Sequence, residues 1–99
     1  MKEVKLICKK VIFYFQKDED AFFEWLKKIK CLDHTSAARD ELYLHIKKKN
    51  ISDDDLRNLI GLFYRYKVNM KQLQIFLNET NKEWFRGKPK GFWYKRVFE

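Results

Sequence analysis

Few side chains in this sequence could act as nucleophiles or as bases. The 99 residues include two serines, two histidines and two cysteines. Ser36 or Cys31 together with His34 would supply a nucleophile and a base, but the surrounding residues form no recognisable catalytic framework. We therefore expect a protein without enzymatic activity.

Cys31 and His34 have the spacing of metal ligands, with two residues between them. A tetrahedral zinc site needs two more ligands, and only Cys8 and His45 remain. We therefore expect no metal and no other cofactor. His45 is interpreted as a surface or hydrogen-bonded histidine. Cys8 and Cys31 are interpreted as buried free thiols, and a disulfide between them is the alternative.

Carboxylates cluster at two places, each just before an apolar stripe with helical spacing. One cluster is Asp18, Glu19 and Asp20, and the other occupies residues 53–55. Negative charge at a helix N-terminus complements the exposed N–H groups and the helix dipole. The alternative is that Asp18, Glu19 and residues 53–55 form an acidic contact surface for a basic partner.

Residues 84–96 interleave aromatic and basic side chains around a centre rich in glycine and lysine. Aromatic faces can stack on bases while lysine and arginine neutralise phosphates, so this pattern is compatible with nucleic-acid binding. The same aromatic residues could instead belong to the core of a small domain, or to a protein interface. The residues that would contact nucleic acid are Lys88, Lys90, Trp93, Tyr94, Lys95 and Arg96.

The chain that positions these residues begins and ends with a basic segment. The net charge of +8 is divided between residues 1–17, with five lysines and one glutamate, and residues 82–99, with six basic and two acidic side chains. The residues between them are neutral overall. If both ends are strands that pair, the domain has one basic, aromatic face on a neutral body, as expected of a binding surface.

The first half of the chain predicts strands before and after a helix. Apolar residues alternate over residues 4–8 and again over 11–15, with a slip that a bulge or a tight turn would absorb. Asp18 is the expected N-cap of the following helix. Residues 31–40 are expected to form a loop with one helical turn, and residues 41–48 a strand.

The second half predicts two helices and a closing strand. Ser52 is the expected start of a helix with an apolar stripe, and Asn69 is the expected cap of a second helix over residues 70–77. Residues 78–91 are expected to be a loop and residues 92–98 a strand. The sequence therefore predicts one α+β domain over residues 1–99. Its small, mainly antiparallel sheet combines the terminal strands with the strand at 41–48, and about three helices cover one face.

Residues 53–73, with sequence DDDLRNLIGLFYRYKVNMKQL, form the most distinctive stretch of the chain. Together with Asn81-Lys82-Glu83-Trp84-Phe85 and Phe92-Trp93-Tyr94, this stretch resembles the small bacterial immunity proteins of contact-dependent growth inhibition (CDI) toxin systems. The resemblance covers the last half of the chain. It implies a non-catalytic antitoxin that binds one toxin domain as a 1:1 heterodimer and covers its active site.

The resemblance transfers no specific residue, so contact residues are predicted from the chain itself. They are Tyr64, Arg65 and Tyr66 together with the acidic helix starts Asp18, Glu19, Asp53, Asp54 and Asp55. The toxin is expected to be a nuclease, and the protein is expected in the cytoplasm, without a membrane segment, because its longest apolar run is short. The alternative function is a nucleic-acid-binding domain that uses the basic terminal segments.

Overall fold

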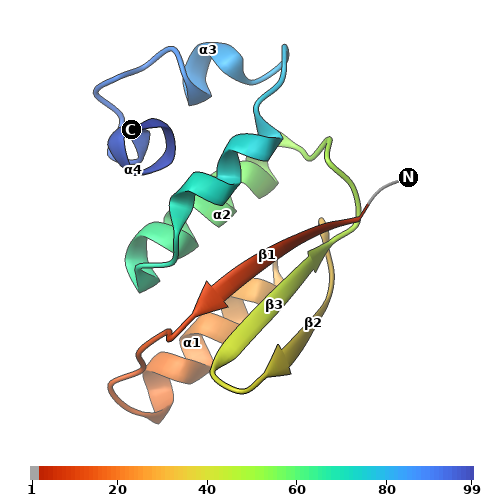
Figure 1. Ribbon diagram of the computed structural model, residues 1–99, viewed down its shortest axis with the longest axis vertical. Helices are drawn as coiled ribbons and strands as arrows, with labels where there is room; N and C mark the ends of the chain where they lie inside the picture. Colours follow the sequence, from red (N-terminus) through yellow and green to blue (C-terminus); the bar gives the residue numbers. More distant parts are fainter. Residues whose placement is uncertain (1–2) are drawn as a thin grey trace.

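The computed structural model describes residues 3–99 and shows an α+β fold built on a three-stranded antiparallel sheet (Figure 1). The strands are β1 (Val4–Lys9), β2 (Leu32–Ala38) and β3 (Glu41–Ile46), arranged in the order β1-β3-β2. The predicted α+β class and the predicted strand near residues 41–48 are therefore confirmed.

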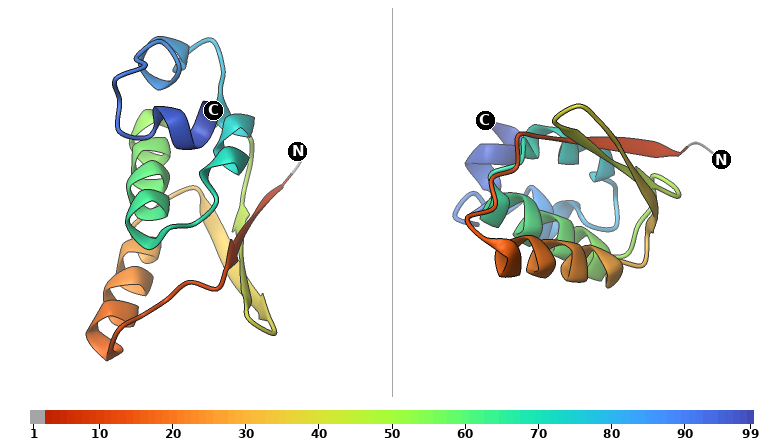
Figure 2. Two further views of the ribbon diagram at one scale, coloured as in Figure 1. Left: turned by 60° about the vertical axis from the view of Figure 1, so that its left-hand side comes forward. Right: turned by 90° about the horizontal axis from the view of Figure 1, so that it is seen from below.

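Helices α1 and α2 and the 3-10 helix η1 lie on one face of the sheet, as two further views show (Figure 2). The short helices α3 and α4 lie beyond the end of the sheet, at the opposite end of the molecule from α1 (Figure 1). The helical bounds are α1 Gln16–Lys27, α2 Asp53–Tyr66, η1 Met70–Phe76, α3 Lys82–Phe85 and α4 Tyr94–Phe98.

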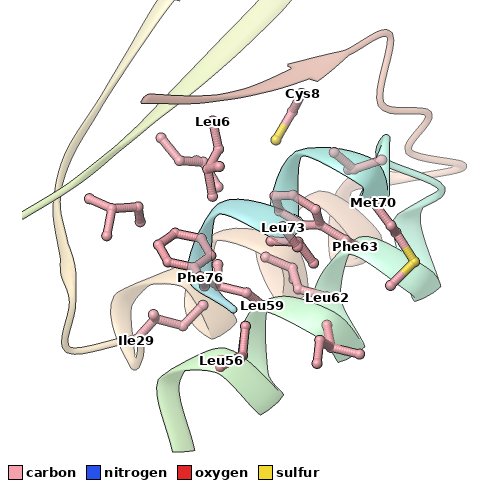
Figure 3. Packing of buried hydrophobic residues seen from close by; sticks show 14 of the residues in the cluster. Leu6, Cys8, Ile29, Leu56, Leu59, Leu62, Phe63, Met70, Leu73 and Phe76 are labelled. Atoms are coloured by element: carbon pink, nitrogen blue, oxygen red, sulfur yellow. The ribbon is translucent and has the colours of Figure 1, made fainter. Parts of the chain in front are cut away.

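The core lies between the sheet and helix α2. Alternate residues of β1 and β3 are buried on the inner face of the sheet, because successive side chains of a strand point to opposite faces. The predicted apolar stripe of α2 packs against them together with η1 (Figure 3). The buried residues at this interface include Leu6, Cys8, Leu44, Ile46, Leu56, Leu59, Ile60, Phe63, Met70, Leu73 and Phe76.

Two of the three predicted helix caps are confirmed. The Ser52 side chain accepts a hydrogen bond from the backbone N–H of Asp55, and the Asn69 side chain accepts one from Lys71. The third cap was predicted wrongly, because α1 already begins at Gln16 and Asp18 lies in its first turn. There Asp18 still faces the positive end of the helix dipole.

Two segments of the prediction are wrong in their secondary structure. The predicted loop at 31–40 contains β2, an edge strand whose residues beyond Leu32 are all exposed, so its sequence lacks an apolar alternation. The predicted terminal strand at 92–98 is not formed, and residues 94–98 are helix α4. Trp93 precedes the helix, one turn before the buried Val97. The side-chain amide of Gln74 in η1 donates to the carbonyl of Val97 and fixes this helix to the body.

The terminal basic segments therefore do not pair as strands. The sheet neighbour of β1 is β3, and the other edge of β1 is covered by Gln72, which both accepts from the N–H and donates to the carbonyl of Ile7. Two smaller differences accompany this one. Residues 11–15 lie outside the strands, and the predicted loop at 78–91 contains α3.

Cys8 and Cys31 are both buried and free, as predicted. Burial raises the pKa of each thiol to about 12, and the carboxylate of Asp55 contributes to the shift at Cys31. Since the thiolate is the reactive form, neither cysteine is expected to react at pH 8 in the folded protein. Titration with an aromatic disulfide reagent, with and without denaturant, measures this difference. Rapid reaction of both thiols in the native protein would contradict it.

The same pKa shifts predict how stability depends on alkaline pH. The folded pKa lies above the ordinary value of 9.0, so the folded state keeps its thiol protons after the unfolded state has lost them. The contribution of the two thiols to the free energy of unfolding is therefore constant below about pH 8 and decreases as pH rises from about 9 towards 12. Denaturant titrations at several pH values, with Cys8→Ala as the comparison, measure this decrease.

Candidate partner-binding surface

The connection between β1 and α1 places apolar side chains in solvent. Lys10 has a positive φ of 50°, which ends the strand, and its N–H donates to the carbonyl of Asp40. Beyond it, Ile12, Tyr14 and Phe15 are 65%, 80% and 68% exposed. Three large exposed side chains within four consecutive residues are more than scattered surface exposure, and such patches indicate interaction sites.

An aromatic cluster beneath this connection holds it in place. Phe13 points inward, and its ring centroid lies 5.3 Å from that of Phe22 in α1 and 6.0 Å from that of Tyr66 in α2. Phe22 and Tyr66 are themselves 4.9 Å apart in an edge-to-face arrangement. The backbone N–H of Tyr14 also donates to the Asp18 carboxylate over 3.3 Å. The outward side chains are therefore attached to a packed base.

An open groove of about 340 Å³ lies beside this connection. Its charged lining contains three basic groups and one carboxylate, and the apolar Ile12 and Tyr14 form part of its wall. Because tyrosine and arginine dominate binding energy at protein interfaces, this composition suits a protein partner. The lining residues are Lys10, Ile12, Tyr14, Asp18, Arg65, Tyr66 and Lys67.

Three of the predicted contact residues meet at this groove. Asp18 comes from α1, and Arg65 and Tyr66 come from the last turn of α2. Arg65 is exposed, whereas the ring of Tyr66 is buried in the aromatic cluster. Glu19 follows Asp18 in the first turn of α1 and is half-buried.

The acidic start of α2 lies at the other end of that helix. A helix of 14 residues is about 20 Å long, so residues 53–55 are not part of the groove. Asp53 and Asp54 are exposed, but Asp55 is buried and accepts a hydrogen bond from the N–H of Lys30 at 3.1 Å. Asp55 therefore connects the segment that follows α1 to α2 and is not accessible to a partner.

Tyr64 faces away from the groove, towards the C-terminal segment. Its ring lies 4.8 Å from that of Phe92, and the Arg96 guanidinium lies 4.4 Å above it. Ile12, Tyr14 and Phe15 were not predicted as contact residues, because the apolar alternation over residues 11–15 is typical of a strand. The signal available was the pair of lysines at 9 and 10, where the apolar phase changes.

The basic aromatic segment uses its largest side chains for packing. The Trp93 indole N–H donates to the carbonyl of Phe85 at 2.9 Å, and its ring packs against Trp84. Tyr94 packs against Phe98. The side chains of residues 84–96 that remain exposed are Arg86, Lys88, Pro89, Lys90, Phe92, Lys95 and Arg96.

No protein-family model matches this sequence, and the searches of curated proteins and of solved structures found no match. Within residues 3–99, no helix has the length and apolar character needed to cross a membrane. The function must therefore be inferred from the surface itself.

Proposed function

We propose that this chain is an immunity protein that binds and neutralises a cognate bacterial toxin, a nuclease, in a 1:1 complex. The observation that supports this most is the exposed segment of Ile12, Tyr14 and Phe15 beside a groove with Arg65. The resemblance of residues 53–73 to CDI immunity proteins supports the same proposal. The complex would form in the cytoplasm, and its function would require neither a cofactor nor a catalytic group.

The mechanism is steric occlusion of the toxin's active site. Apolar and aromatic side chains would supply the binding energy by burial at the centre of the contact. The groove lining carries three basic groups against one carboxylate, so the contacted toxin surface would be acidic. A nuclease that holds divalent cations with carboxylates presents such a surface at its active site.

Co-expression with the product of the adjacent upstream gene tests the proposal. We expect a stoichiometric complex that survives a wash at about 0.5 M salt, where electrostatic contacts are strongly screened. Addition of one equivalent of this protein should abolish the nuclease activity of the partner. Full nuclease activity in a purified complex would contradict the proposal.

Washing the same purified protein at increasing salt concentration also tests the alternative function, nucleic-acid binding. Retention of nucleic acid that decreases by orders of magnitude between about 50 and 200 mM salt would support binding through Lys88, Lys90, Lys95 and Arg96 instead.

A further inference from the structure

The outer face of the sheet carries a cluster of nitrogen and oxygen donors at one end. A register shift between Leu32 and His34 interrupts β2 there, and His34 then pairs with His45 of β3. Glu3 immediately precedes β1 on the other side of β3. One donor atom from each of Glu3, Asp33 and His34 lies within 4.8 Å of the other two. All three side chains are exposed and accessible to an ion in solution.

We propose that Glu3, Asp33 and His34 form a binding site for a divalent transition-metal ion of the zinc type. Ligands bound at about 2.0–2.2 Å to one ion lie about 3–4 Å apart, so small rotations of exposed side chains would bring these donors into place. A mixed imidazole and carboxylate set favours zinc over magnesium or calcium, which prefer oxygen ligands. Three protein ligands leave a coordination position for water.

Neighbouring side chains orient the proposed ligands. The Nδ1 atom of His45 lies 2.9 Å from a carboxylate oxygen of Glu3, and its Nε2 atom lies 2.8 Å from the hydroxyl of Ser36. If the Ser36 hydroxyl donates to Nε2, the proton of a neutral His45 is on Nδ1 and is donated to Glu3. Hydrogen bonds of this kind hold ligating carboxylates in metal sites. Ser36, which the sequence placed beside His34, thus supports the site through His45.

Stacking of the two imidazole rings also holds the proposed ligand His34 in place. His34 stacks on His45 with ring centroids 4.1 Å apart and an interplanar angle of 8°. The Nδ1 atom of His34 lies 2.8 Å from the Asp33 carboxylate, so two proposed ligands are already adjacent. The two carboxylates repel each other, and a divalent cation between them would replace this repulsion with attraction. Cys31, the metal ligand suggested by spacing, is buried and is not part of this set.

Calorimetric titration of the untagged protein with zinc chloride tests the site. We expect one equivalent to bind, and an excess of magnesium should not compete. Asp33→Asn and His34→Gln should each weaken zinc binding by about 100-fold or more, because each removes one of three ligands. Ser36→Ala should weaken it by about tenfold, as expected for a group that orients a ligand. The histidine ring signals in the NMR spectrum should shift in the wild-type protein.

Asp40→Asn is the matched control, since Asp40 is an exposed carboxylate in the turn of the same hairpin. It should bind zinc as the wild type does. Circular dichroism of each variant confirms folding, which these exposed substitutions should preserve. Absence of one-equivalent zinc binding, or equal binding by the wild type, Asp33→Asn and His34→Gln, would overturn the proposal. Neither result depends on the toxin.

Discussion

Replacing Phe22 with alanine should lower the free energy of unfolding by about 3–5 kcal/mol, the usual cost of removing a buried phenylalanine. Phe22 is fully buried. The centroid of its ring lies 5.3 Å from that of Phe13, 5.2 Å from that of Phe23 and 4.9 Å from that of Tyr66. The cavity would lie where α1, α2 and the connection 10–15 meet. Denaturant titration followed by circular dichroism measures the loss.

Phe15→Ala is the matched control, because Phe15 is in the same region but is 68% exposed. Its effect on the free energy of unfolding should lie within about 0.5 kcal/mol. Since small domains are stable by only about 5–15 kcal/mol, Phe22→Ala removes a large share of the total. Equal stability of the two variants would show that the aromatic cluster does not form as described.

The sequence was sufficient for the elements whose cues are local. Helix α2 has a hydrogen-bonding cap at Ser52, acidic residues in its first turn and a continuous apolar stripe. Strand β3 alternates because Leu44 and Ile46 are buried on one face, whereas Tyr43 and His45 are only half-buried on the other. In both elements the pattern reflects a single buried face, and the predictions were correct.

Elements fixed by tertiary contacts were missed. Strand β2 lies at the edge and buries almost no side chains, so nothing in its composition indicates a strand. Helix α4 contains three residues that favour strands, Tyr94, Val97 and Phe98, beside two basic ones. Its contact with η1 at Val97 overrides that preference. The intrinsic propensity of a segment decides its secondary structure only where such tertiary packing is absent.

The candidate binding surface was predicted in part. Asp18, Arg65 and Tyr66 were proposed for separate reasons, and the fold brings them to one groove. Ile12 and Tyr14 were assigned to a strand, because a segment with one inward and two outward side chains has the same spacing as a strand. The lysine pair at 9 and 10 marks a change in the apolar phase, but the sequence does not show that this change ends the strand. The structure shows it in the left-handed conformation of Lys10.

Tyr14→Ala should weaken binding to the toxin by about 2–4 kcal/mol, which corresponds to about 30-fold to 1,000-fold in Kd. Among residues 3–99, Tyr14 is the most exposed of the large hydrophobic side chains, at 80%, and it borders the groove that contains Arg65. Its removal should not destabilise the free protein, since its side chain packs little. Surface plasmon resonance or calorimetry with the purified toxin measures the change in affinity.

Two exposed apolar residues outside the groove provide controls. Phe92→Ala removes an aromatic ring that is 56% exposed beside Tyr64, and Ile75→Ala matches Ile12→Ala as a second exposed isoleucine. We expect Ile12→Ala to weaken binding and Ile75→Ala to leave it unchanged. If Phe92→Ala instead abolished binding while Tyr14→Ala had no effect, the toxin would bind at the C-terminal end.

The Arg65→Ala variant distinguishes the electrostatic contribution to toxin binding from the contribution of apolar burial. Long-range attraction to an acidic toxin surface acts mainly on the association rate and is screened by salt, whereas burial of Tyr14 acts mainly on dissociation. Arg65→Ala should therefore reduce the association rate constant and its dependence on salt, while Tyr14→Ala should raise the dissociation rate constant at every salt concentration. If Arg65→Ala changed neither rate constant, the basic lining of the groove would not face the toxin, even if Tyr14 did.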